Sequence, residues 1–222
     1  MEAKRFEVKR GGVNAVCFSP DGRYILAGGS MITSLWDVDS QEVRRFEHEH
    51  NTFTDFVCSV CFSPDGNYAL SGYDDSTIRL WDVKSGREIR QFKGHRRSIN
   101  TVSFSPDGRY ILSGANSDDN FIRLWDVEDG KKIRDFLGHT FGVSSICFSP
   151  CGRYALSGSH DKTIRLWDIE SGREIRRFEM HTNKICSVNF SPDGRYALSG
   201  CEDKTIRLWE FDWDWEFPDS KN

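Results

Sequence analysis

Serine, histidine and aspartate side chains recur together in the combination that activates a hydrolytic nucleophile. Such an enzyme needs one exposed serine, a histidine that takes its proton, an aspartate that orients the histidine, and an oxyanion hole. Here the combination recurs in four places and a tryptophan follows each set, which a single active site does not require. The four sets are His50, Ser71, Asp75 and Trp81; His95, Ser113, Asp119 and Trp125; His139, Ser157, Asp161 and Trp167; and His181, Ser199, Asp203 and Trp209.

The chain around these sets repeats with one period. A tryptophan recurs every 42 to 45 residues, and a phenylalanine that precedes Ser-Pro keeps the same spacing. A repeat of about 40 to 45 residues is typical of propeller blades. The markers are Trp36, Trp81, Trp125, Trp167 and Trp209, with Phe18, Phe62, Phe104, Phe148 and Phe190.

Each unit holds four short extended segments. In the third unit, 99–104 alternates apolar and polar residues, as a half-buried strand does. The sequence Ser-Pro-Asp-Gly at 105–108 predicts a tight turn, because proline presets the first corner and glycine accepts a positive φ. Strands are then expected at 110–114, 121–125 and 132–136. The sequence therefore predicts an all-β chain, a β-propeller of five four-stranded antiparallel blades.

The units resemble WD (Trp-Asp) repeats, most of all the near-identical arrays found in bacteria. Gly94-His95 and Gly138-His139 open two units, Trp-Asp pairs close four, and Trp209-Glu210 closes the fifth. The resemblance implies that in each set the aspartate orients the histidine, the histidine contacts the serine, and the serine meets the indole N–H. Such sets are structural networks rather than active sites, and no enzyme is expected. His48 is the alternative to His50.

The propeller is expected to occupy 1–217 as one domain, followed by a tail at 218–222. The repeats run roughly over 9–47, 48–93, 94–137, 138–179 and 180–217. Residues 3–8 match the fourth-strand pattern and are expected to complete the fifth blade, closing a five-bladed ring. The aromatic segment 213–217 competes for that place. The alternatives are an open arc that closes with a second chain, or a fragment of a longer array.

The first unit departs from the others. It has Lys9, Ala27 and Ser30 where the others have histidine, serine and aspartate, and it keeps Trp36. We expect its blade to be the least stable. A separate repeated feature is an arginine in the third strand of the other units, for which inter-blade salt bridges are expected; these are Arg79, Arg123, Arg165 and Arg207.

Composition and motifs narrow the classes of partner. The formal net charge of −4 argues against nucleic-acid binding, which needs a positive field. No apolar run is long enough for a membrane helix. Five of the seven cysteines recur at matched strand positions, and the seven predict no disulfide framework, which favours a cytoplasmic location. No metal site is expected at Cys58-x-x-Cys61, because strand residues three apart point to opposite faces. No phosphate-binding loop or other cofactor site appears.

The loops after the histidines and before the aspartates vary, while the strands hardly change. Variable loops on a rigid scaffold commonly carry function. We expect them to form a protein-binding face at the mouth of the central channel, with a partner peptide or loop held there. The alternative function is an assembly module that forms homo-oligomers or joins a longer chain; a hydrolase is a remote third. The anchors are Tyr73, Arg97 and Phe141, and the polar selectors are Arg96, His160, Lys184 and Glu202.

Overall fold

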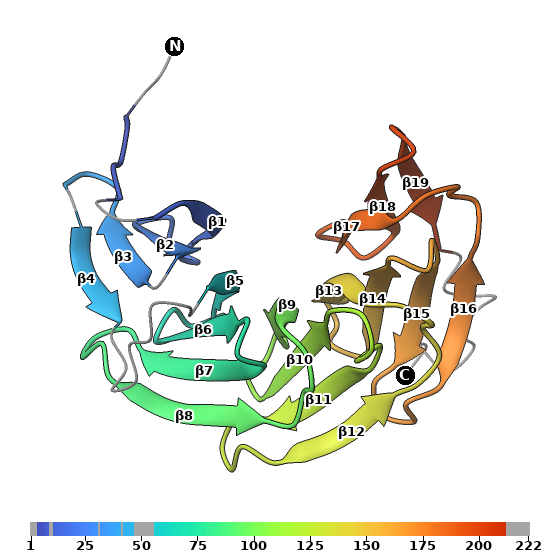
Figure 1. The fold of residues 1–222 in the computed structure, drawn as a ribbon, viewed down its shortest axis with the longest axis horizontal. Coiled ribbons are helices and arrows are strands. Elements are labelled where there is room, and N and C mark those ends of the chain that lie inside the picture. Colours follow the sequence, from blue (N-terminus) through green and yellow to red (C-terminus); the bar gives the residue numbers. More distant parts are fainter. Residues whose placement is uncertain (1–3, 9–10, 31, 41, 47–55, 212–222) are drawn as a thin grey trace.

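The computed structural model describes residues 4–8, 11–30, 32–40, 42–46 and 56–211. These residues form five antiparallel sheets arranged as blades in an open arc (Figure 1). Within the described ranges there are strands but no helix, and so no long apolar helix of the kind that spans a bilayer. The expected all-β propeller architecture is confirmed.

Each blade follows the chain from its inner edge to its outer edge. Blade 1 is β1 Val13–Phe18, β2 Tyr24–Gly29, β3 Thr33–Asp37 and β4 Glu42–Phe46; blade 2 is β5 Val57–Phe62, β6 Tyr68–Tyr73, β7 Thr77–Asp82 and β8 Glu88–Lys93. Blade 3 is β9 Ile99–Phe104, β10 Tyr110–Ala115, β11 Ile122–Asp126 and β12 Lys132–Phe136; blade 4 is β13 Val143–Phe148, β14 Tyr154–Ser159, β15 Ile164–Asp168 and β16 Glu174–Phe178. Blade 5 is β17 Ile185–Phe190, β18 Tyr196–Cys201 and β19 Ile206–Glu210.

The Ser-Pro-Asp-Gly turns set the register of the first two strands of each blade. In blade 3, Ser105 Oγ donates to Asp107 Oδ1 at 2.5 Å, and the amide of Arg109 donates to the same oxygen at 3.1 Å. Gly108 has φ +73°, a conformation that glycine adopts without a steric cost. Phe104 then pairs with Ile111, so that the alternating apolar residues of β9 and β10 share faces.

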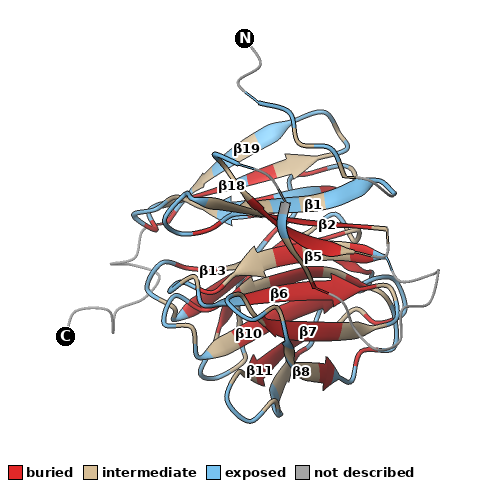
Figure 2. Cartoon of the chain, turned by 90° about the vertical axis from the view of Figure 1, so that its left-hand side faces the viewer, coloured by how far each residue is buried: buried red, intermediate tan, exposed pale blue. Residues whose placement is uncertain are grey.

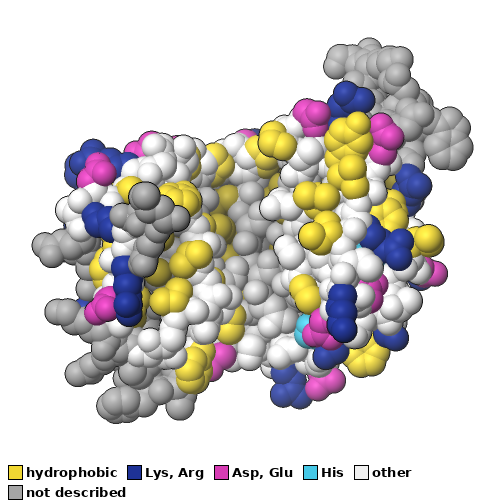
Figure 3. All heavy atoms as spheres, turned by 90° about the horizontal axis from the view of Figure 1, so that it is seen from above, with side chains coloured by type: hydrophobic (Ala, Val, Ile, Leu, Met, Phe, Trp, Pro, Cys, Tyr) yellow, Lys and Arg dark blue, Asp and Glu magenta, His cyan; other side chains and the backbone are white. Residues whose placement is uncertain are grey.

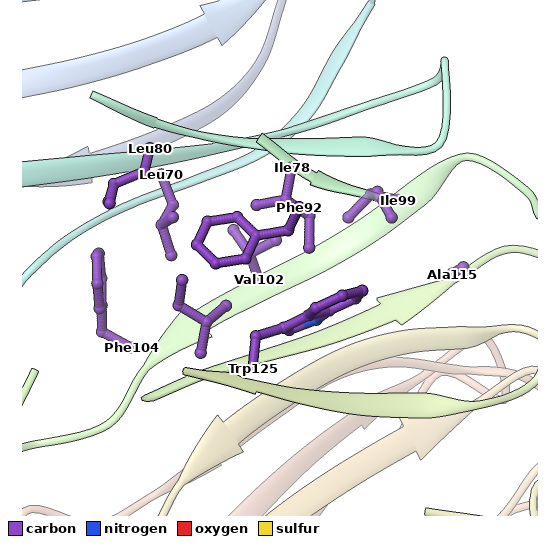
Figure 4. Close-up of a cluster of buried hydrophobic side chains, with 10 residues drawn as sticks. Leu70, Ile78, Leu80, Phe92, Ile99, Val102, Phe104, Ala115 and Trp125 are labelled. Atoms are coloured by element: carbon purple, nitrogen blue, oxygen red, sulfur yellow. The ribbon is translucent and has the colours of Figure 1, made fainter. Parts of the chain in front are cut away.

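The core lies between blades rather than inside one. Leu70, Ile78, Leu80 and Phe92 of blade 2 pack on Ile99, Val102, Phe104 and Trp125 of blade 3 (Figure 4). A glycine in the second strand lets the next blade approach: a Cβ on Gly72 would lie 2.6 Å from Ile99 Cγ2. Gly28, Gly114 and Gly158 are in the same close contact with Val57, Val143 and Ile185. Four alike interfaces therefore join the five blades.

The two ends of the arc are not joined among the described residues. Blade 5 has three strands, and residues 4–8 pair with none of them. Instead, the ring of Phe6 contacts that of Trp36 in blade 1, with centroids 5.9 Å apart. β1 and β19 are largely exposed, whereas inner strands between them, such as β6 and β10, are largely buried (Figure 2). The expected closure of the ring by residues 3–8 is not found, and residues 213–222 lie outside the described ranges.

Candidate functional site

The serine, histidine, aspartate and tryptophan of blade 3 form one continuous hydrogen-bonded chain. Trp125 Nε1 donates to Ser113 Oγ at 2.8 Å, Ser113 Oγ lies 2.7 Å from His95 Nε2, and His95 Nδ1 lies 3.1 Å from Asp119 Oδ2. The bonds are all satisfied when the serine donates to Nε2 and the histidine carries its proton on Nδ1. The network links the loop before the first strand to the second and third strands of the same blade.

Blades 4 and 5 repeat this geometry. His139 lies 2.8 Å from Asp161 and 2.7 Å from Ser157, which accepts from Trp167 at 2.8 Å. His181, Asp203, Ser199 and Trp209 are joined by the same three bonds at 2.8 to 2.9 Å. In blade 2, Trp81 donates to Ser71 at 2.7 Å, while Asp75 accepts from Arg79 at 2.9 Å. His50 lies outside the described residues.

In blade 1 the indole N–H of the tryptophan donates to a different acceptor. Ala27 offers no hydroxyl, and Trp36 Nε1 donates instead to Ser34 Oγ at 2.9 Å. Ser34 stands where the other blades have the third-strand arginine, a substitution that the sequence alignment of the units could have revealed. Lys9 lies outside the described residues.

Burial decides the protonation of these networks. Desolvation lowers the pKa of His95 and of His139 below the ordinary value of 6.5, and the hydrogen bonds from the two histidines to Asp119 and Asp161 oppose that shift only in part. Burial alone would raise the pKa of Asp119, but hydrogen bonds from His95, the Arg96 amide and Arg123 outweigh it and hold that pKa well below its usual range. The pair is therefore a neutral imidazole beside a carboxylate at neutral pH.

These networks hold no accessible nucleophile. Ser71, Ser113, Ser157 and Ser199 are all buried, and each accepts the indole N–H of its tryptophan. A hydrolase requires the opposite arrangement, in which the serine oxygen faces the substrate. The geometry fits a structural role, in which the network provides hydrogen-bond partners for buried polar groups and links the strands of a blade.

Three of the four third-strand arginines, Arg79, Arg123 and Arg165, form ion pairs within their own blades, so the expectation of inter-blade salt bridges is wrong for them. Arg123 Nε lies 3.2 Å from Asp135 and its Nη1 2.9 Å from Asp119, both in blade 3. Arg165 Nη1 lies 2.6 Å from Glu174, across the pair β15–β16. The side chain of each arginine reaches sideways to the neighbouring strand, because the carboxylates stand on the same face of the same sheet.

A histidine, a cysteine and an aspartate also gather in blade 5. Ligand atoms of His181, Cys201 and Asp203 lie within 4.8 Å of one another. Cys201 Sγ, however, donates to the carbonyl of Asn183 at 3.1 Å and accepts from the Asp203 amide at 3.3 Å. Ser159 makes the same two bonds in blade 4. The cysteine thus stands in the place of a structural serine, and these hydrogen bonds account for its position.

The two sets of variable loops lie at the same end of the blades. In each of blades 2 to 5 a residue before the structural aspartate donates its amide to the loop that precedes the first strand. His160 donates to Gly142 at 3.0 Å, and Glu202 donates to Lys184 at 3.0 Å. The inner strands are joined in succession, for example by Asn100 Nδ2 to Val143 O at 3.0 Å. The loops of neighbouring blades therefore lie in sequence along one rim.

Six of the seven expected binding residues have surface on this rim. Phe141 is 56% exposed, and His160 is partly buried. Arg96, Arg97, Lys184 and Glu202 are exposed. Arg97 also pairs with Asp118 at 2.9 Å, a contact that the sequence did not predict because blade 3 has a longer loop there.

Tyr73 is not a surface anchor. It is 1% exposed and packs between blades 1 and 2, with its hydroxyl 3.4 Å from Thr33 Oγ1 and the Arg79 guanidinium 4.6 Å from its ring centre. Other blades have a small residue here, namely Ala115 and Ser159. The expectation was wrong because Tyr73 is the last residue of β6 rather than the first residue of the loop.

Comparison with known proteins agrees with this geometry. A family model described as "WD domain, G-beta repeat" matches residues 3–37, 40–82, 86–126, 130–168 and 172–210. A relative, GID complex subunit 7 of Schizosaccharomyces pombe, is 35% identical over 92 residues, which are 41% of this chain and 18% of that protein. The chain thus spans less than a fifth of that relative's length. Each of the last four matches covers the fourth strand of one blade and the first three strands of the next, and the first match covers residues 4–8 and β1 to β3. With five matched repeats over most of its length, the chain belongs to the WD-repeat family.

Proposed function

We propose that this protein is a non-enzymatic scaffold that binds a peptide or loop of another protein on the rim formed by the variable loops. The observation that carries the proposal is the contrast within the chain: the strands repeat almost unchanged, while the rim presents Phe141, Arg96 and Arg97 to solvent from adjacent blades. Exposed arginine and aromatic side chains are the types that dominate interface energies.

The rim is held rigid, which lowers the entropic cost of binding. The amide of Arg96 donates to the buried Asp119 at 2.5 Å, and Ser159 Oγ donates to the carbonyl of Phe141 at 3.1 Å. The side chains project from these fixed backbones. The structural networks thus contribute to binding indirectly, by fixing the loops that carry the contacts.

Protein is the proposed partner class rather than nucleic acid or membrane. The formal net charge is −4, and Arg97 is already paired with Asp118. The name of the related GID subunit says that it is part of a complex, which supports an assembly role here. We also propose a cytoplasmic location, to which the seven free cysteines are suited.

The test is selection from a displayed library of random peptides on the full chain. Peptides that bind should lose at least about tenfold in affinity, about 1.4 kcal/mol, with Arg97→Glu or Phe141→Ser. Arg109→Glu and Arg153→Glu, in the Ser-Pro-x-Gly turns at the opposite end of the blades, are the matched controls. If the controls abolish binding and the rim variants do not, the proposed face is wrong.

A further inference from the structure

Four inter-blade interfaces share the same parts. A Val or Ile of the first strand sits against a glycine of the preceding blade, as Val143 does on Gly114. A phenylalanine of the fourth strand contacts the tryptophan of the next blade, with ring centroids 5.8 Å apart for Phe136 and Trp167. Leucine and isoleucine side chains fill the space between these two contacts.

Blade 5 carries one half of a fifth such interface, and no described residue packs against that half. Gly200 stands where Gly114 and Gly158 stand, yet no described atom lies within 4 Å of a Cβ built on it. Leu198 and Leu208, whose counterparts Leu156 and Leu166 are buried, are exposed, and Ile206 is 79% exposed.

Blade 1 carries the other half. Val16 and Phe18 are 65% and 66% exposed, whereas their counterparts Val60 and Phe104 are buried in the core. With Phe6 and Trp36 they line an open groove of about 450 Å³. Phe6 already makes the contact with Trp36 that fourth-strand phenylalanines make with the next blade. Residues 4–8 therefore take the place of the fourth strand of a preceding blade, and no described strand pairs with them as its third strand.

The ion pairs of the third-strand arginines also indicate that a fourth strand would fit beside blade 5. Arg79 and Arg165 lie 3.6 and 2.6 Å from the fourth-strand carboxylates of Glu88 and Glu174. Arg207 of β19 has no such ion pair among the described residues. A fourth strand that carries an acidic residue at the position of Glu174 would supply it.

The size of the opening limits what fills it. The two ends face one another across a gap that is narrower than the arc of five blades (Figure 1). Seen from above, a hollow separates the ends, and hydrophobic side chains lie on both of its sides (Figure 3). We therefore expect fewer blades than a complete second copy of the arc to occupy this gap.

We propose that the opening between blades 5 and 1 is a docking site for a separate polypeptide made of a few WD-type blades, fewer than five. Its first strand pairs with β19 and places an acidic side chain on Arg207. Its next strand sets a Val or Ile against Gly200, and its last strand pairs with residues 4–8. This surface is distinct from the loop rim of the proposed function, and it rests on the continuity of the inter-blade interface.

The chain's own repeats supply the probe. Tagged segments 84–127, 84–169 and 84–211 each begin before a fourth strand and end after a third strand. Each is co-expressed with the full chain, and the complex is sized by light scattering. We expect one segment to co-purify at a ratio of one to one, and amide exchange in β19 to slow at least tenfold in that complex.

Two variants test the geometry. Gly200→Val should be tolerated in the free chain, because no described atom lies within 4 Å of a Cβ at this position, but its side chain should occupy the place of the incoming Val or Ile. Val16→Asp places a charge on the exposed apolar face of blade 1. Each should reduce co-purification at least tenfold, while melting of the free chain shows that both fold. Arg97→Glu and Phe141→Ser should leave docking unchanged, which separates this site from the loop rim. Failure of every segment to bind, equal binding to Gly200→Val, or a free chain that dimerises through these faces would overturn the proposal.

Discussion

Trp125 Nε1 donates to Ser113 Oγ at 2.8 Å, and both residues are buried. The serine is the centre of the blade 3 network, because its oxygen accepts from the indole and donates to His95. Removal of this single hydroxyl therefore leaves two buried polar groups without a partner.

Ser113→Ala should lower the free energy of unfolding by about 1–3 kcal/mol, the cost of unsatisfied buried groups. Urea denaturation of the full chain measures this value. Ser117→Ala, at an exposed loop position of the same blade, is the control and should change stability by less than about 0.5 kcal/mol. Equal effects of the two substitutions would mean that the network does not stabilise the blade.

The turn of blade 4 lacks the aspartate that the other Ser-Pro-x-Gly turns share. Ser149 Oγ faces Cys151 Sγ at 3.2 Å, whereas Ser105 donates to Asp107 at 2.5 Å and the Arg109 amide donates to the same carboxylate. Cys151→Asp should raise the free energy of unfolding by about 0.5–1.5 kcal/mol, since it restores these hydrogen bonds. Thermal melting of the variant measures the gain, and Cys186→Asp, at an exposed strand position, should give none.

Lys162 holds a left-handed backbone conformation, with φ +71°, in the turn before β15. Glycine adopts this conformation without the steric cost that a Cβ brings. Lys162→Gly should therefore stabilise the chain or leave it unchanged, within about 1 kcal/mol. Lys132→Gly, in strand β12 where no positive φ is required, should destabilise it instead. The denaturation midpoint should fall for Lys132→Gly and should rise or stay the same for Lys162→Gly. A fall for both would contradict the turn conformation.

Acid should destabilise the chain first through His95 and His139. Their folded pKa is lowered by burial below 6.5, so the unfolded state binds protons first as the pH falls. Stability is fully present above pH 6.5 and decreases as the pH drops below that value. The free energy of unfolding, measured in urea from pH 7.5 to 5, should fall, and His139→Gln should flatten the slope. A stability that rises on acidification would show that these histidines are charged in the folded chain.

The blades could be predicted from the sequence because each is specified locally. The strand at 99–104 has the alternation of a half-buried strand, and the turn at 105–108 has the residues that its backbone requires. The sequence also places serine, histidine, aspartate and tryptophan in phase, and the structure brings them together in blades 3 to 5. Local chemistry and global fold agree at these positions.

The contacts between blades and the closure of the ring could not be predicted from local sequence patterns. Whether Tyr73 ends a strand or begins a loop depends on its packing under Thr33 of another blade, which no local pattern reports. Closure of the ring depends on the angle between blades, which the glycine contacts of Gly72 and Gly114 set. The fourth-strand pattern of residues 4–8 is recognisable in the sequence, and Phe6 makes the fourth-strand contact with Trp36 of the next blade. Residues 4–8 nevertheless pair with no strand of blade 5 among the described residues, and no local pattern reports that.

The most direct test of the central claim is the affinity of a library-selected peptide for the wild-type chain, the Phe141→Ser variant and the Arg109→Glu control. Phe141 is exposed on the loop rim and Arg109 lies in a turn at the other end of the blade. The account predicts that Phe141→Ser weakens binding at least about tenfold and that Arg109→Glu leaves it unchanged. Unchanged binding to Phe141→Ser, with binding lost in Arg109→Glu, would place the partner on the opposite face and contradict the account.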